Sequence, residues 1–161
     1  MLDIYTVSFF GHREIPNPFL LEEKLMPILR DLINSKEYFE FLVGRDGDFD
    51  RLAASAVKDS IQNFSSGNTS LILVQPYKRA EYRDNKESFE AFYDEVQICE
   101  KSSKAHPKAA ILVRNKQMIE RSDLVICALF RKNGGAYKAV SYAETLNKKI
   151  INLCDITKNL P

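Results

Sequence analysis

Short, uninterrupted apolar runs alternate along this sequence with segments in which apolar residues recur every three or four positions. The first pattern is typical of strands buried on both faces of a sheet, and the second is typical of helices that cover such a sheet. The apolar runs predict strands at 4–10, 39–43, 70–75, 96–99, 124–129 and 150–154. The helical spacings predict helices at 18–34, 52–61, 89–96, 107–121 and 135–146. Between them, residues 76–85 are polar and predict an irregular segment.

This alternation determines the expected fold class. Strands joined by helices form right-handed crossovers, which place the strands parallel and the helices on both faces. We therefore expect an α/β, Rossmann-like, three-layer fold with a mostly parallel sheet of about five to six strands. The 161 residues contain no glycine-serine or proline-rich linker, which predicts a single domain over 1–161.

Composition excludes several classes of protein. The 23 basic and 22 acidic residues give a formal charge of +1, whereas a protein that coats nucleic acid usually carries a large basic excess. Nucleic acid is therefore not an expected partner. The three cysteines, Cys99, Cys127 and Cys154, lie far apart in apolar stretches, which predicts reduced thiols in a reducing compartment. No Cys/His zinc pattern is present, so no metal site is predicted.

The sequence also predicts a protein without a membrane partner. Its longest apolar run, 124–130, is much shorter than the roughly 20 residues that span a bilayer, and no basic signal region precedes Asp3. We expect a cytoplasmic location. A chain of this length buries roughly 70% of its unfolded surface on folding, so no cofactor is required for stability.

Three loops that follow predicted strands contain glycine together with polar residues. They are Gly11-His12-Arg13, Gly44 to Asp50, and Asn133-Gly134-Gly135. Because parallel strands end at the same edge, the loops are expected to converge on one rim. Glycine lets backbone N–H groups approach a ligand, and a helix N-terminus carries partial positive charge. The coincidence of the three loops therefore predicts a site for a phosphate or carboxylate.

Several of these side chains have two interpretations. Arg13 is suited to pair with a phosphate, or alternatively forms a surface ion pair with Glu14 or with a helix. A structural role is favoured over catalysis for His12. The alternating acids of 46–50 lack the glycine and glutamate positions of a calcium loop, so calcium is rejected. Asp50 is interpreted either as a helix N-cap or as a group that contacts ligand hydroxyls.

Five short motifs, taken together, resemble the SLOG superfamily, the Rossmann-like group that includes DprA and the LOG phosphoribohydrolases. The small YpsA-like (DUF1273-type) members are the most similar. The matching pieces are Phe9 to Arg13, Val43 to Ala53, Pro76-Tyr77, Arg114 to Met118 with Ser122-Asp123, and Gly134-Gly135 with Tyr142-Ala143. The resemblance implies a pocket for a nucleotide, with the glycines and Arg13 near its phosphate or ribose. It also implies a homodimer.

The resemblance does not carry LOG catalysis with it. Arg114 and Met118 fit the Arg-x-x-x-Met helix of the LOG enzymes. Counting from Gly134-Gly135, however, the position of the catalytic glutamate holds Ser141, which cannot replace a carboxylate. Glu144, three residues later, is the remaining candidate acid. Enzyme activity is therefore not expected, and Arg114 and Glu144 are the only catalytic candidates.

The leading hypothesis is a sensor or accessory module that binds a nucleotide or an ADP-ribose-like molecule at the carboxyl edge of the sheet. One alternative is a LOG-like nucleotide N-glycoside hydrolase. A second is DprA-like binding of single-stranded DNA, because Gly47-x-Phe49-Asp50-x-x-Ala53 also resembles that branch. The predicted ligand-binding residues are Gly11, His12, Arg13, Gly44, Gly47, Asp50, Arg114, Asn133, Gly134 and Gly135.

Overall fold

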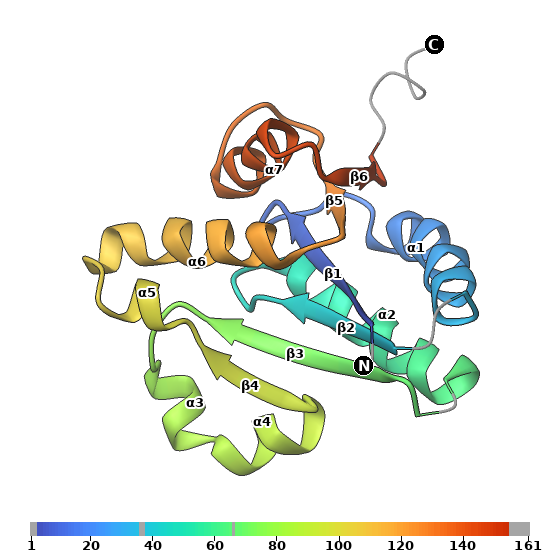
Figure 1. Ribbon diagram of the computed structural model, residues 1–161, viewed down its shortest axis with the longest axis horizontal. Helices are drawn as coiled ribbons and strands as arrows, with labels where there is room; N and C mark the ends of the chain where they lie inside the picture. The colour runs from blue at the N-terminus through green and yellow to red at the C-terminus, as the bar shows by residue number, and fades with distance from the viewer. Residues whose placement is uncertain (1–2, 36–37, 66, 155–161) are drawn as a thin grey trace.

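A six-stranded, all-parallel sheet forms the centre of the structure. The computed structural model describes residues 3–35, 38–65 and 67–154. The strand order is β4-β3-β2-β1-β5-β6 (Figure 1). The strands are β1 (Ile4–Gly11), β2 (Tyr38–Val43), β3 (Thr69–Gln75), β4 (Glu95–Ile98), β5 (Leu124–Ala128) and β6 (Lys149–Asn152). The predicted fold class, α/β and Rossmann-like, is confirmed.

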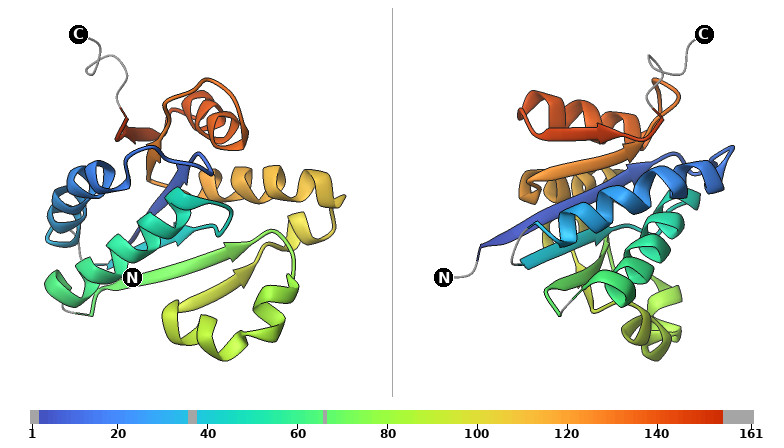
Figure 2. Two further views of the ribbon diagram at one scale, coloured as in Figure 1. Left: turned by 180° about the vertical axis from the view of Figure 1, so that it is seen from behind. Right: turned by 90° about the vertical axis from the view of Figure 1, so that its right-hand side faces the viewer.

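Helices cover both faces of this sheet. Two long helices, α1 (Pro18–Ile33) and α2 (Asp48–Phe64), lie on one face, and α6 (Pro107–Arg121) and α7 (Gly135–Thr145) lie on the other (Figure 2). Three short helices connect β3 to α6 around β4: α3 (Ala80–Asp84), α4 (Lys86–Phe92) and α5 (Glu100–Ser103). No described helix has both the length and the apolar character needed to cross a bilayer.

The alternation of side chains along each strand produces two separate cores. In β2, Phe41 points to the α1–α2 face, and its neighbour Leu42 points to the α6–α7 face; both are fully buried. Burying apolar side chains on both faces contributes roughly 1.5–3 kcal/mol for each large residue. This burial explains why the strand sequences are apolar without interruption.

The order in which strands are added to the sheet reverses at β1. From β1 the chain builds β2, β3 and β4 outward on one side, and it then returns through α6 to place β5 on the other side of β1. The loops after β1 and β5 therefore diverge to opposite faces of the sheet. In open parallel sheets this switch point is where ligands bind.

Two local predictions were wrong. Residues 76–85 are not wholly irregular, because Ala80–Asp84 forms α3, with Tyr82 buried in the core. Asp50 is not a helix N-cap: α2 begins two residues earlier, at Asp48, and Gly47 occupies the cap position. At α3 the packing of Tyr82 on Phe89 holds the short helix. At Asp50 the carboxylate accepts a hydrogen bond from Asp46 N–H, in the loop before α2, and does not cap the helix.

Candidate ligand-binding site

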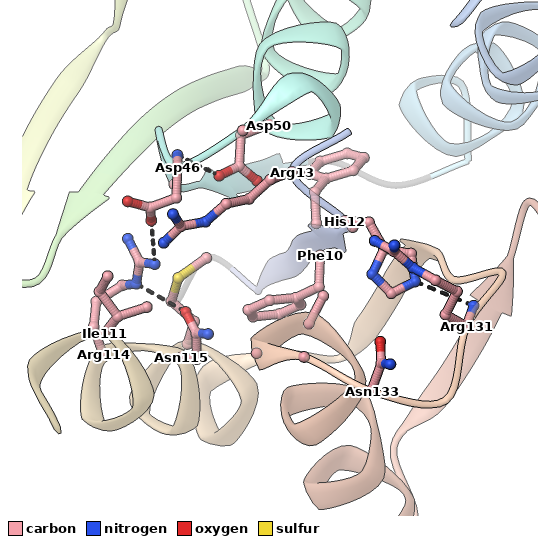
Figure 3. Close-up of a pocket in the computed structure, with 18 residues that line it drawn as sticks. Phe10, His12, Arg13, Asp46, Asp50, Ile111, Arg114, Asn115, Arg131 and Asn133 are labelled. Atoms are coloured by element: carbon pink, nitrogen blue, oxygen red, sulfur yellow. Dashed lines mark hydrogen bonds and ion pairs between the residues drawn. The ribbon is translucent and has the colours of Figure 1, made fainter. Parts of the chain in front are cut away.

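A pocket of about 280 Å³ opens at the carboxyl edge of the sheet, at the switch point between β1 and β5 (Figure 3). The three glycine loops converge on it, as expected. Its lining includes every residue predicted to bind a ligand: Gly11, His12, Arg13, Gly44, Gly47, Asp50, Arg114, Asn133, Gly134 and Gly135. The volume lies near the lower end of the range for small-molecule pockets, roughly 300–1,000 Å³. Ligand binding by these residues stays a prediction.

Two of the glycines are required by packing. A Cβ at Gly11 would overlap the ring of Phe49, which is fully buried under the end of β1. A Cβ at Gly47 would overlap the backbone Cα of Arg13, because the loops after β1 and β2 touch at this point. A hydrogen bond of 2.8 Å from Asp48 N–H to Arg13 O joins the same two loops. Gly11 and Gly47 therefore bring the two loops together.

The Gly134-Gly135 turn has a different role. Gly134 has a φ of 92°, a conformation that glycine adopts readily, and a Cβ at either glycine would meet no atom within 4 Å. Gly134 is the N-cap of α7, and no side chain caps this helix. The first N–H groups of a helix have no partner within it, and the helix dipole adds partial positive charge there. The turn therefore presents backbone N–H groups that suit an anion, and anion binding there stays a prediction.

On the α6 side of the pocket, Arg114 holds several groups together. Its side chain is almost fully buried and makes three hydrogen bonds: to Asn115 Oδ1 at 2.9 Å, to Val74 O at 2.9 Å and to Asp46 Oδ2 at 2.7 Å. Asp46 also forms an ion pair with Arg79 at 2.7 Å. Burial alone would raise the pKa of Asp46, but the two guanidinium groups hold it below its ordinary value.

Asp50 lies beside this ion pair and lacks one of its own. Asp50 Oδ2 accepts a hydrogen bond of 2.8 Å from Asp46 N–H, and no described residue forms a salt bridge with Asp50. A Cβ at Gly44 would lie 3.0 Å both from Asp50 Oδ2 and from Arg114 Nη1, so glycine leaves space for both groups. Burial raises the pKa of Asp50 to about 6, although Asp46 N–H and Arg114 oppose the shift.

His12 has a structural role on the side of the pocket formed by the loop after β5. Its Nε2 accepts a hydrogen bond of 3.2 Å from Arg131 N–H, and its ring packs edge-on against Phe130, with centroids 4.6 Å apart. Burial and the nearby Arg131 charge lower the pKa of His12. A neutral, hydrogen-bonded imidazole therefore fixes the loop after β5 against the loop after β1.

Basic residues gather on this edge of the sheet. We define the carboxyl rim as the segments that follow β1, β2, β3 and β5, namely 12–17, 44–47, 76–79 and 129–134. It contains six basic and two acidic residues: Arg13, Arg45, Lys78, Arg79, Arg131 and Lys132, against Glu14 and Asp46. The charged residues in the described segments that lead into the strands at the opposite edge are one basic and three acidic: Lys148, against Asp3, Asp94 and Asp123. Although the formal charge is only +1, basic residues are therefore concentrated at the carboxyl rim.

Four of these rim cations remain available to a ligand. Arg13, Lys78, Arg131 and Lys132 are exposed, and none of them forms an ion pair with any described residue. The alternative interpretation of Arg13, an ion pair with Glu14, is therefore wrong. In Figure 3, Arg13 lies on the same side of the pocket as Asp46 and Asp50, whereas Arg131 and Asn133 lie opposite.

Glu144 does not join the site. It is exposed on α7, and α7 contributes only its first residues, Gly135 and Ala136, to the pocket lining. Nine residues of helix separate Glu144 from Gly135, which is roughly 13 Å along the axis. The placement of Glu144 as a displaced catalytic acid is therefore wrong, because the helix carries it away from the pocket.

Among the described residues, no three His, Cys, Asp or Glu side chains are arranged to hold a metal ion.

Sequence reasoning missed three polar residues of the lining: Asp46, Asn115 and Arg131. A signal existed for Asp46 and Arg131, because both follow directly on predicted strands. The role of Asn115 had no local signal, since its carbonyl oxygen orients the neighbouring Arg114 only once α6 has packed on β3.

Comparison with known proteins found similarity in structure alone. No family model and no curated protein sequence matches the chain. It is similar to DNA processing protein A from Helicobacter pylori, a structure described for its single-stranded DNA binding mode, with 18% identity and a TM-score of 0.61. It is also similar to DNA processing protein A (DprA) from Streptococcus pneumoniae, with 14% identity and a TM-score of 0.66.

Both matches cover 91% of this chain but only 63% of the first protein and 49% of the second. The chain therefore spans less than two thirds of either protein. At these identities the similarity concerns the arrangement of the backbone. It shows that the chain has the same Rossmann-like fold as part of the DNA processing A proteins.

Proposed function

We propose that the carboxyl rim binds a segment of single-stranded nucleic acid and that the pocket takes one phosphate of the strand. The observation that carries this proposal is the set of four exposed rim cations without an ion-pair partner among the described residues: Arg13, Lys78, Arg131 and Lys132. The fold shared with DNA processing protein A, described for single-stranded DNA binding, supports the same choice. We also propose membership of the SLOG superfamily, in its YpsA-like branch.

The pocket supplies the groups that a phosphate needs. The uncapped N-terminus of α7 offers backbone N–H donors, and Arg13 offers a planar guanidinium with no other ionic partner in the described chain. Charge-assisted hydrogen bonds of this type contribute about 1.5–3 kcal/mol each. One phosphate held between Arg13 and α7 would fix the register of a strand along the rim.

Aromatic side chains accompany the rim cations. Tyr77 is 36% exposed and lies under the Arg79 guanidinium at 5.5 Å, and Phe130 lies under that of Arg131 at 5.0 Å. Basic surfaces interleaved with aromatic rings are typical of proteins that bind single strands, because bases stack on rings or on guanidinium planes. Tyr77 follows β3 and Phe130 follows β5, so the two pairs lie on either side of the β1–β2 end of the pocket.

A free nucleotide or an ADP-ribose-like molecule is the second candidate ligand. The pocket's position at the topological switch point favours it, since small ligands of such folds bind there. The volume of about 280 Å³ suits one nucleotide unit better than a dinucleotide. In this case the protein would act as a sensor or accessory module.

Oligonucleotide length separates the two candidates. Fluorescence anisotropy would measure the affinity for labelled oligothymidylates of 3, 6, 12 and 24 nucleotides over a series of salt concentrations. Strand binding predicts that affinity rises with length, with a slope of log K against log salt approaching about −3 for four neutralised phosphates. Affinity that is independent of length and salt would favour the free nucleotide, and no binding at low salt would refute both.

Substitution at the rim tests the location. Arg13→Ala is expected to weaken oligonucleotide binding roughly tenfold, because it removes one charge-assisted contact. Arg30→Ala is the matched control: Arg30 is exposed in the last turn of α1, far from the rim, and should leave the affinity unchanged. Equal affinities of wild type and Arg13→Ala would place the binding surface elsewhere.

A further inference from the structure

The charges on the pocket lining nearly cancel. Three guanidinium groups, from Arg13, Arg114 and Arg131, line the pocket together with the carboxylates of Asp46 and Asp50. Burial and Arg131 lower the pKa of His12, so His12 adds no charge near neutral pH. With Asp50 ionised, the lining carries a net charge of +1. Attraction to this charge grows in proportion to the ligand charge, whereas the cost of removing an ion from water grows with the square of its charge, so the lining compensates one negative charge better than two.

The two carboxylates contribute differently to this balance. Asp46 is committed to Arg79 and Arg114, both at 2.7 Å. Asp50 has only the hydrogen bond from Asp46 N–H to Oδ2, and no described residue donates to its Oδ1. The charged groups around Asp50 are Asp46 in the loop after β2, Arg51 on α2 and Arg114 on α6. Of the two lining carboxylates, Asp50 is therefore the one without an ion-pair partner among the described residues, and its charge is the less compensated one that a bound anion meets.

We propose that Asp50 makes the pocket selective for a phosphodiester over a phosphomonoester. A phosphodiester carries one negative charge, whereas a terminal phosphomonoester, with a second pKa near 6, is mainly a dianion at pH 7.5. The second charge of the monoester is repelled by the Asp50 carboxylate across the pocket. This inference rests on the proposed function. It names the ligand group as an internal phosphate of a strand and gives a physical reason for the exclusion of free nucleoside monophosphates.

A matched pair of ligands isolates this charge. Thymidine 5′-monophosphate and its methyl ester share base, sugar and phosphate position, and at pH 7.5 they differ by about one unit of charge. Displacement of a labelled oligonucleotide would measure both affinities. The wild-type protein is expected to bind the methyl ester more tightly. Tighter binding of the dianionic monophosphate by the wild-type protein would overturn the inference without requiring any variant.

The substitution Asp50→Asn removes the charge and keeps an oxygen that accepts the Asp46 N–H. Neutralising one charge beside an anion changes affinity about tenfold for each charge that the anion carries. The ratio of the two affinities is therefore expected to shift about tenfold toward the monophosphate. Asp48→Asn is the control, because Asp48 lies in the same turn of α2 but is exposed and does not line the pocket.

The outcomes separate this inference from the proposed function. If both ligands displace the oligonucleotide and Asp50→Asn leaves their ratio unchanged, the inference fails and the proposed function stands. If neither ligand nor any oligonucleotide binds the folded wild-type protein, the proposed function fails and the inference fails with it. Circular dichroism of each variant would show that it is folded.

Discussion

The Asp50 carboxyl destabilises the folded state at neutral pH, and the structure indicates by how much. Burial raises the pKa of this group to about 6, from an ordinary value of 3.8. A carboxyl whose pKa is higher in the folded state than in the unfolded state binds its proton more tightly when folded. The resulting penalty is fully present above about pH 6 and disappears as the pH falls toward 3.8.

The magnitude follows from the shift of about two pKa units. At 1.36 kcal/mol per unit, ionised Asp50 costs the folded state about 3 kcal/mol at pH 7.5. About 1.4 kcal/mol of this penalty is relieved between pH 7 and pH 5. Asp50→Asn is therefore expected to raise the free energy of unfolding by up to about 3 kcal/mol at pH 7.5. For a protein of this size the corresponding rise in melting temperature is roughly 6–12 °C.

Chemical denaturation at pH 7.5, 6 and 5 would measure the effect for wild type, Asp50→Asn and Asp48→Asn. The Asp50 contribution to the pH dependence should vanish in Asp50→Asn and persist in Asp48→Asn. The control variant loses only a favourable charge at the N-terminus of α2, worth about 0.3–1 kcal/mol. An Asp50→Asn protein with wild-type stability at pH 7.5 and a wild-type pH dependence would show that Asp50 is well solvated, and the reasoning above would be wrong.

Two further stability measurements test the architecture of the pocket. Gly11→Ala is expected to lower the free energy of unfolding by about 1–3 kcal/mol, because its methyl group overlaps the Phe49 ring, whereas Gly135→Ala meets open space and should be tolerated. Thermal unfolding checks the pair, and equal effects would contradict the packing. Arg114→Met is expected to lower the free energy of unfolding by about 1.5–3 kcal/mol in urea denaturation, since Asp46 loses one of its two guanidinium partners and keeps Arg79. A loss below 1 kcal/mol would show that Arg79 alone suffices.

Most of the fold could be predicted because its signals are local. The apolar runs and helical spacings place all six strands and the four long helices within a few residues of their observed limits. The strand predicted at 150–154 ends at Asn152, and the last residues, 155–161, lie outside the described chain. The prediction of an irregular segment at 76–85 missed α3 for a physical reason. A five-residue helix contains too few residues to show a periodicity, and it is held by the packing of Tyr82.

Position in the sequence also predicted the edge of the sheet where polar residues gather. Parallel strands oblige their following loops to share one edge, so the glycine loops could be assigned to one rim without coordinates. The reason for each glycine was not predictable in this way. Gly11 is required by Phe49 and Gly47 by the backbone of Arg13, and in each case 34 or more residues of chain separate the partners.

The sequence by itself therefore determined the layers, the order of helices and strands, and the loops that carry the site. Only the tertiary structure decided the electrostatics of that site. Asp46 and Asp50 are four residues apart with the same side chain, yet burial raises the pKa of Asp50 while two arginines hold that of Asp46 low. One of these two arginines, Arg114, is 68 positions away from Asp46 in the sequence. The periodicity of apolar residues can be read from their order in the sequence, whereas desolvation and ion pairing depend on distances between residues in the folded structure.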